Sequence, residues 1–138
     1  MKAIARRVKA DAYTHEIQIR HHRLITDEPD ELGGDDEGPS PQELLAGSLA
    51  SCTAITVAMY AQRKDWNLDQ LEVEVNYATS DRIGLTQFDI VLRLPAELND
   101  NQRQRLREIA GRCPVHRTLA GEVVFRDSVE TLDAHSTT

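Results

Sequence analysis

The sequence predicts an α+β domain in which helices pack on a largely antiparallel sheet. Two observations lead to this class. Segments with apolar residues at every second position stand on both sides of a long apolar helix, and a second helical segment with its own apolar stripe follows the later strands. A chain of 138 residues can bury a hydrophobic core, so we expect one domain over residues 1–138.

The N-terminal part, from Ala3 to Thr26, is expected to form strands. Ile17, Ile19 and Ile25 share one parity there, and polar residues occupy the other. The next segment, residues 27–41, holds three prolines and three glycines among seven acidic residues, which argues against a regular element. We interpret this segment as a loop, and its composition is typical of a solvated connector.

A long helix is predicted to begin directly after this loop. Ser40 is a suitable N-cap, Pro41 suits the first helical position, and Glu43 completes a capping box. No charged residue occurs between Glu43 and Arg63. A helix that is apolar all round is normally buried, so we expect a central helix that a second subunit partly covers. Its apolar run, residues 46–61, is too short and too rich in Ser and Thr to be expected to span a bilayer.

Two segments of alternating residues follow the helix, at 71–77 and 88–94. Turn-forming residues at 78–84 predict that these two strands form a hairpin. A second helix is expected after the hairpin, with Asn99 or Asp100 as its cap.

The second helix carries an apolar stripe that ends in Cys113. Pro114 should break or kink it, because proline has no N–H to donate. We expect a short turn at 114–119, a last strand around 122–126, and a flexible tail at 127–138.

Composition argues against several classes of protein. The formal net charge is −7, whereas nucleic acid and anionic lipid both require a basic surface. Residues 1–12 are basic but lack the apolar core of a signal peptide. We therefore expect a cytoplasmic protein with neither a nucleic acid nor a membrane as partner. In such a reducing compartment, two cysteines are inert or cycle, and do not form a structural scaffold.

The two cysteines, Cys52 and Cys113, lie on the apolar faces of two different helices and should point into the same core. The residues alone leave open whether they form a redox pair or are structural. Cys113 is favoured as the thiol of lower pKa, because it stands next to Pro114 at a candidate helix start and because Arg112, His116 and Arg117 are close in sequence. Burial in the middle of a helix should raise the pKa of Cys52.

A metal site is a weaker interpretation. Cys113 and His116 have the spacing of two ligands of one metal ion, and His21 and His22 could add to them. Zinc sites normally need three or four protein ligands, and the sequence holds no second spaced pair. We therefore expect no metal and no other cofactor.

Two motifs together resemble a known family. The first is PQELL at residues 41–45, followed by an alanine-rich helix with Cys52, and the second is RCPVHRTL at residues 112–119. In this order they resemble the OsmC/Ohr family of thiol peroxidases, in its general OsmC-like branch, over residues 15–125. The resemblance implies an OsmC-like fold, in which antiparallel sheets pack on a long central helix. It also implies an intertwined homodimer with active sites at the subunit interface.

The resemblance further implies a chemistry. Cys52 would be the peroxidatic thiol, which reduces an organic hydroperoxide or hydrogen peroxide and becomes a sulfenic acid. Cys113 would be the resolving thiol, which closes a Cys52–Cys113 disulfide, and an external dithiol, of lipoyl type in the family, would reduce that disulfide. The alternative is a non-enzymatic OsmC-fold protein that responds to redox state or binds an apolar ligand. A purely structural domain with buried cysteines is a third interpretation.

The chain departs from the family where the peroxidatic thiol is activated. In hydroperoxide-reducing members, a glutamate ten residues before that thiol holds an arginine of an early strand. Gln42 stands at the glutamate position here, and Glu43 lies about 100° away around the helix. Arg7, Arg20 and Arg23 are candidates for the arginine, and we select Arg20.

Overall fold

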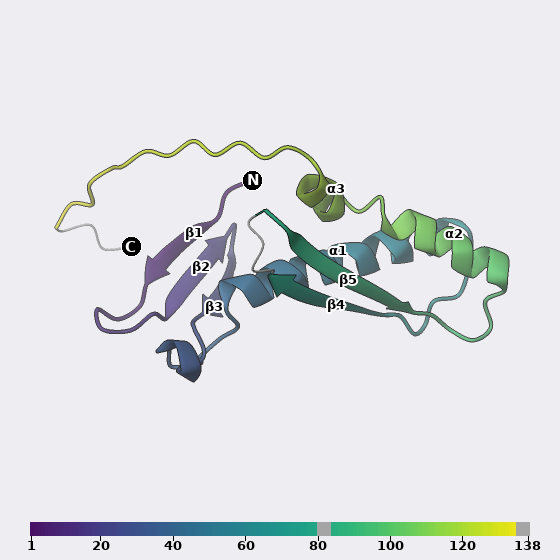
Figure 1. Ribbon diagram of the computed structural model, residues 1–138, viewed down its shortest axis with the longest axis horizontal. Coiled ribbons are helices and arrows are strands. Elements are labelled where there is room, and N and C mark those ends of the chain that lie inside the picture. The colour runs from purple at the N-terminus through teal and green to yellow at the C-terminus, as the bar shows by residue number, and fades with distance from the viewer. Residues whose placement is uncertain (80–83, 135–138) are drawn as a thin grey trace.

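The computed structural model describes residues 1–79 and 84–134. Within them, the strands form two antiparallel sheets beside a long helix, which confirms the predicted α+β class (Figure 1). The elements in chain order are β1 (Ile4–Arg7), β2 (His15–Ile19), β3 (His22–Thr26), the short 3₁₀ helix η1 (Asp30–Leu32), α1 (Pro41–Arg63), β4 (Glu72–Thr79), β5 (Thr86–Arg93), α2 (Asp100–Ala110) and α3 (Pro114–Ala120).

The N-terminal sheet is an antiparallel meander in the order β1-β2-β3. Ile17 pairs with Leu24 and Glu16 pairs with Ile25 across β2 and β3. Directly paired residues lie on the same face of a sheet, so Ile25 shares a face with Glu16 and not with Ile17. Ile17 and Ile25 therefore lie on opposite faces of the sheet, although both have odd residue numbers. Leu24 and Ile25 are 46% and 39% exposed, so the chain itself covers neither face of β3 fully.

Helix α1 begins at the predicted capping box. The Ser40 hydroxyl accepts a hydrogen bond from the Glu43 N–H at 3.2 Å, and the Glu43 carboxylate accepts one from the Ser40 N–H at 2.9 Å. Pro41 occupies the first turn, and the helix ends at Arg63. The predicted start of this helix is therefore confirmed.

The expectation that α1 is buried all round is wrong within one chain. Its buried residues recur every fourth position and form a single face against β4, α2 and α3: Leu49, Thr53, Val57 and Ala61. On the remaining surface, Ile55 is 59% and Met59 is 56% exposed. We call the exposed residues Gly47, Ser48, Ser51, Ile55, Ala58 and Met59 the open face of α1.

Helix α1 is longer than its apolar run. The helix has 23 residues, and its most apolar 18-residue window has a mean hydropathy of 1.6, so by length and composition it could cross a membrane. Core helices of soluble proteins pass the same test. The expectation that the run at residues 46–61 does not span a bilayer therefore stays a prediction.

The hydrophobic core lies where α1 crosses α2. Val57, Ala61, Leu98, Leu106 and Ala110 form it, and Leu92 of β5 and Trp66 are among the partly buried residues around it. The start of α2 is fixed by a second capping box, in which the Asn99 side chain accepts from the Gln102 N–H at 2.8 Å. The prediction of Asn99 as a cap is confirmed.

Strands β4 and β5 pair from Glu72↔Arg93 to Thr79↔Thr86, which confirms the predicted antiparallel pair. Residues 80–83 of the expected link lie outside the described residues. On the inner face of the pair, the Tyr77 and Phe88 rings stack with centroids 4.7 Å apart.

The C-terminal part differs from the prediction in three ways. Helix α2 ends at Ala110, so Cys113 is not on its stripe, and residues 114–119 form helix α3 instead of a turn. Residues 122–126 form no strand, because no described segment pairs with them. Residues 121–134 instead make an extended arm that leads toward the N-terminal sheet's end of the molecule (Figure 1), with Phe125 81% exposed. Residues 135–138 of the predicted tail lie outside the described residues.

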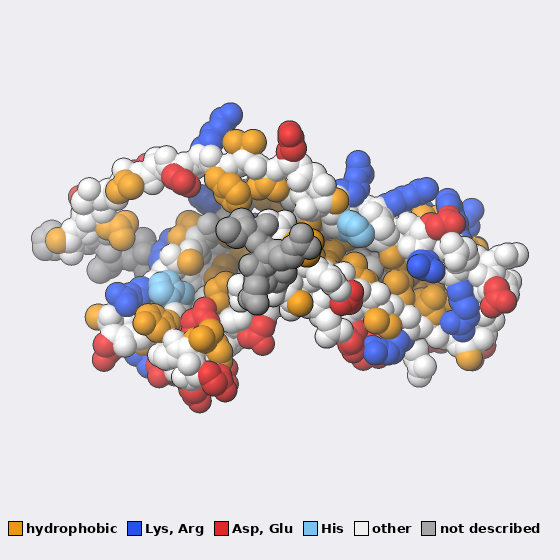
Figure 2. All heavy atoms as spheres, in the orientation of Figure 1, with side chains coloured by type: hydrophobic (Ala, Val, Ile, Leu, Met, Phe, Trp, Pro, Cys, Tyr) orange, Lys and Arg blue, Asp and Glu red, His pale blue; other side chains and the backbone are white. Residues whose placement is uncertain are grey.

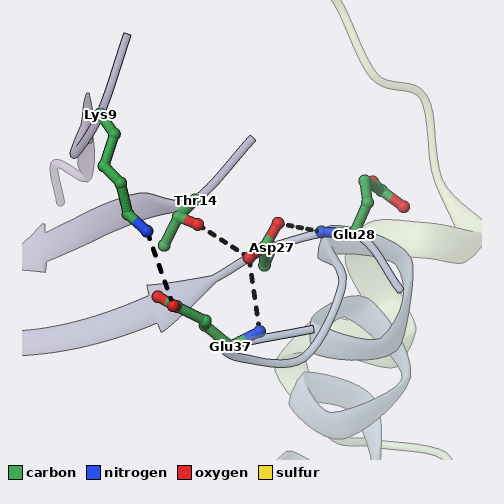
Figure 3. A network of polar contacts seen from close by, with 5 residues as sticks. All are labelled: Lys9, Thr14, Asp27, Glu28 and Glu37. Atoms are coloured by element: carbon green, nitrogen blue, oxygen red, sulfur yellow. Dashed lines mark hydrogen bonds and ion pairs between the residues drawn. The ribbon is translucent and has the colours of Figure 1, made fainter. Parts of the chain in front are cut away.

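The acidic segment 27–41 is more ordered than a solvated connector. The buried Asp27 carboxylate accepts hydrogen bonds from the Thr14 hydroxyl at 2.8 Å and from the N–H groups of Glu28 and Glu37 at 2.7 and 3.3 Å (Figure 3). The other acidic side chains of this segment gather on the surface beside the N-terminal sheet. Lysine and arginine side chains, in contrast, gather on the surface of α2 (Figure 2). Asp27 thus fixes the path of the segment, and its other acidic side chains keep the surface of the segment hydrated.

Candidate functional site

The structure brings the two cysteines together at the junction of α1 and α3. Cys52 is half-buried on α1, and Cys113 is fully buried in the link between α2 and α3. Both are free thiols, and they lie close enough for each to shift the pKa of the other. The two residues are 61 positions apart in the chain, and the packing of α3 on α1 makes them neighbours.

Cys113 is the N-cap of α3. Its sulfur accepts a hydrogen bond from the His116 N–H at 3.2 Å and contacts the buried Thr53 hydroxyl at 3.8 Å. Burial alone would raise the pKa of Cys113. Hydrogen bonds from the His116 N–H, the Cys52 thiol, the Thr53 hydroxyl and the Val115 N–H outweigh it, so this pKa lies below its ordinary value.

The pKa of Cys52 moves in the opposite direction. Burial raises it most, and the neighbouring Cys113 sulfur raises it further, while the Val115 N–H and the Thr56 hydroxyl partly oppose this. Cys113 is therefore the more acidic thiol of the pair, as predicted. Hydrogen bonds at the N-terminus of α3 are among its causes, in line with the predicted helix start, whereas the charges of Arg112 and Arg117 are not among the largest.

Sequence reasoning missed two parts of this environment. Thr53 lies beside Cys52 in the chain but points to the core, where its hydroxyl reaches Cys113. The second part is the length of α3, because a short turn was expected after the candidate helix start at Cys113. Cys113 followed by Pro114 repeats the order of Ser40 and Pro41, which is a cap followed by proline in the first turn.

His116 has two separate environments. Its backbone N–H binds Cys113, whereas its ring lines a cavity of about 410 Å³ and leaves the buried Nδ1 without a hydrogen-bond partner in the described chain. Among residues 1–79 and 84–134, no cluster of three His, Cys, Asp or Glu side chains could hold a metal ion. The cavity lies between α1, the β4–β5 pair and α3, and its walls are Leu45, Leu49, Tyr77, Thr86, Phe88, Ile90, His116, Leu119 and Ala120.

The candidate arginines make local contacts within the N-terminal sheet. Arg20 has a left-handed backbone (φ 53°) in the β2–β3 turn, and its guanidinium lies 3.3 Å from the His22 ring. Arg7 donates to the Ala12 carbonyl at 3.3 Å, and Arg23 pairs with Glu16 at 3.1 Å. A role for Arg20 in activating Cys52 stays a prediction.

The two residues at the start of α1 have different surroundings. The Glu43 carboxylate is engaged in the capping box, where the hydrogen bonds from the Ser40 N–H and hydroxyl lower its pKa. Gln42 is exposed on the first turn. Neither side chain has a described contact with the cysteine pair, and their activating role also stays a prediction.

Comparisons with known proteins agree with this architecture. The fold is similar to that of an OsmC-like protein from Mycoplasma pneumoniae (TM-score 0.72, 19% identity, 87% of this chain and 86% of that chain). It is also similar to the organic hydroperoxide resistance protein OsmC from Legionella pneumophila (TM-score 0.63, 20% identity, 88% and 90%). A third similar structure is an organic hydroperoxide resistance protein from Elizabethkingia anophelis (TM-score 0.65, 17% identity, 86% of each chain).

Identities this low establish the fold alone, and no curated protein matches the chain significantly. The sequence profile of OsmC-like proteins, however, matches residues 34–126, which make up more than half of the chain and include both cysteines. The chain therefore belongs to the family of OsmC-like proteins.

Proposed function

We propose that this protein is a cysteine-based peroxidase that reduces organic hydroperoxides, or hydrogen peroxide, through a Cys52–Cys113 disulfide. The observation that carries the proposal is that α3 packs on α1 and places the two free thiols near each other, so that each shifts the pKa of the other. A disulfide can form only between cysteines that approach each other closely. Family membership supports the proposal, since two of the similar structures are organic hydroperoxide resistance proteins.

The reaction begins when the pair of thiols loses one of its two protons. Interacting thiols lose their protons in steps that belong to the pair, and the first loss is favoured by the hydrogen bonds to Cys113. Transfer of the remaining proton from Cys52 to Cys113 leaves the negative charge on Cys52. The Cys52 thiolate attacks the terminal peroxide oxygen, so that an S–O bond forms, the O–O bond breaks, and the alcohol leaves after taking a proton from solvent. The Cys113 thiol then displaces water from the sulfenic acid and closes the disulfide.

A thiol must return the pair to its reduced state in each cycle. We propose a dithiol reductant of lipoyl type, which attacks the disulfide by exchange and leaves as its own disulfide. A reducing compartment such as the cytoplasm suits two free cysteines. We further propose a homodimer, in which a second copy covers the open face of α1.

Mass spectrometry after one equivalent of cumene hydroperoxide tests the proposal. We expect the reduced protein to lose two hydrogens and to yield a peptide pair joined through Cys52 and Cys113. Cys52→Ser should abolish turnover, and Cys113→Ser should leave oxidised Cys52 that dimedone traps. Two thiols that remain free after hours with the peroxide would contradict the proposal.

A non-enzymatic ligand-binding protein is the second candidate. The observation in its favour is the cavity that His116 lines together with apolar side chains such as Leu49 and Phe88, whose size lies in the range of small-molecule sites. It predicts that apolar ligands bind equally well when Cys52 and Cys113 are both replaced by serine, and that peroxide leaves the thiols unchanged. The disulfide experiment therefore separates the two functions.

A further inference from the structure

A group of basic side chains surrounds Tyr60 near the C-terminal end of α1. The Arg105 Nε of α2 donates a hydrogen bond to the Tyr60 hydroxyl at 2.9 Å, and its guanidinium carbon lies 5.4 Å from the centre of the ring. The Lys64 ammonium lies 5.7 Å from the same ring centre. The hydrogen bond from Arg105, together with the charges of Arg105, Lys64 and Arg112, lowers the pKa of Tyr60 against the opposing effect of burial. We call Tyr60, Lys64, Arg105 and Arg112 the basic cluster.

The positive charge of the basic cluster is only partly neutralised. Glu108 pairs with Arg105 at 3.1 Å, and within residues 1–79 and 84–134 it is the one carboxylate that forms an ion pair with the cluster. Lys64 and Arg112 are exposed. This excess of positive charge occurs in a chain whose formal net charge is −7, and lysine and arginine side chains gather at this end of the molecule (Figure 2). Like charges that are held close together repel one another, so an anionic partner would stabilise the cluster.

Contacts within the chain hold the basic cluster in place. Trp66 packs edge-on against the Tyr60 ring, with ring centroids 5.7 Å apart, and both side chains are half-buried. The Arg105 guanidinium is fixed between the Tyr60 hydroxyl and the Glu108 carboxylate, and its Nη2 atom has no partner within the described chain. Side chains that are already held in place lose little conformational entropy on binding. Tyrosine, tryptophan and arginine are also the residue types that contribute most to the affinity of protein–protein interfaces.

We propose that the basic cluster binds an acidic segment of a partner protein, whose carboxylates accept hydrogen bonds from Lys64, Arg105 and Arg112. The planar guanidinium groups match the geometry of carboxylates. Nucleic acid and anionic membranes are less suitable partners, because they present long arrays of negative charge that the rest of this acidic chain repels. Arg112 directly precedes Cys113, so the partner would lie next to the link that holds this thiol. The binding itself does not depend on the peroxidase reaction.

Fluorescence anisotropy of a labelled oligoglutamate peptide tests the inference. We expect the wild type to bind this peptide more tightly than an oligoglutamine peptide of the same length in low-salt buffer, and to lose the difference at high salt. Lys64→Gln and Arg112→Gln should each weaken binding of oligoglutamate about two- to fivefold, as the loss of one exposed charge pair implies. The control is Lys9→Gln, which removes the same charge from an exposed position beside Glu37 and should leave the affinity unchanged.

Tyr60→Phe separates a specific site from general attraction between charges. It keeps the ring and the net charge of the protein but removes the hydroxyl that holds Arg105, so we expect it to weaken oligoglutamate binding about two- to tenfold. Because Lys64 and Arg112 are exposed, their glutamine variants should keep the thermal midpoint of the wild type.

Four results would overturn the inference. They are equal binding of the two peptides, an equal loss of affinity in Lys9→Gln, an unchanged affinity in Tyr60→Phe, and tighter binding of a DNA oligonucleotide than of oligoglutamate. A wild-type assembly that Lys64→Gln dissociates would also overturn it, because the cluster would then belong to an interface with a second copy.

Discussion

At the scale of single residues, Cys113 stands where helices usually place Ser, Thr, Asp or Asn. Its sulfur accepts from the His116 N–H at α3 much as the Ser40 hydroxyl accepts from the Glu43 N–H at α1. A thiolate is a far stronger acceptor than a neutral thiol, so the cap favours ionised Cys113. Because the pKa values of the two thiols shift in opposite directions, the first proton comes mainly from Cys113, and Cys52 holds the remaining proton until it passes to Cys113 in the reaction.

Alkylation of each cysteine as a function of pH tests this order. The midpoint for Cys113 should lie at a lower pH than that for Cys52, because their pKa values move in opposite directions from the ordinary value. Iodoacetamide labelling followed by peptide mass spectrometry measures both midpoints, whatever the difference in accessibility. Thr53→Val removes one donor to Cys113 and should raise its midpoint, whereas Ser51→Ala, an exposed neighbour, should not. Coincident midpoints for the two cysteines would contradict the assignment.

At the scale of elements, the acidic segment before α1 depends on Asp27. Its carboxylate joins the end of β3 to Thr14 and to the backbone of the segment (Figure 3). Two glycines allow the close packing that this requires, since a Cβ at Gly34 would meet the Glu28 carbonyl and one at Gly38 the Ile25 carbonyl. The segment therefore delivers Ser40 to its capping position along a defined path.

The pH dependence of unfolding tests the role of Asp27. Burial opposes its charge, but hydrogen bonds from the Thr14 hydroxyl and from backbone N–H groups lower its pKa below the ordinary 3.8. A depressed folded-state pKa stabilises the fold above the unfolded-state value, and this stability is lost as the pH falls through the folded-state value. Asp27→Asn should therefore unfold at lower urea concentration than wild type at pH 7, and the difference should narrow below pH 4. Asp11→Asn, at an exposed loop position, is the control and should match wild type at both pH values. A difference that is constant with pH would contradict the argument.

At the scale of the whole molecule, residues that are neighbours in sequence predicted the helices and strands well. They predicted the long-range contacts of these elements less well. The capping residues Ser40 and Asn99 and the alternation in β4 and β5 are encoded by neighbouring residues, and the structure contains each of them. The failures involve distant partners. The segment 122–126 has strand-forming residues but no described strand beside it, and the contact between Thr53 and Cys113 depends on how α3 packs on α1.

The apolar surfaces that one chain leaves uncovered have a common explanation in the proposed homodimer. They comprise the open face of α1, the exposed Leu24 and Ile25 of β3, and the extended arm with Val124 77% and Phe125 81% exposed. Exposed apolar surface often marks interaction sites. A second copy offers the same surfaces, and its sheet edges are a place where the extended arm could add.

A charge placed on the open face of α1 tests the dimer. We expect the wild type to elute with twice the chain mass of 15.5 kDa in light scattering at micromolar concentration, and Ile55→Glu to elute as a monomer. The reason is that a glutamate at the centre of an apolar interface would lose its hydration without gaining a partner. Gln104→Glu introduces the same charge at an exposed position of α2, away from the open face of α1, and should remain dimeric. Circular dichroism should show that both variants keep their helices, because residue 55 lies opposite the buried Leu49–Ala61 face. A wild-type monomer, or an Ile55→Glu dimer of unchanged affinity, would show that this face is not the subunit interface.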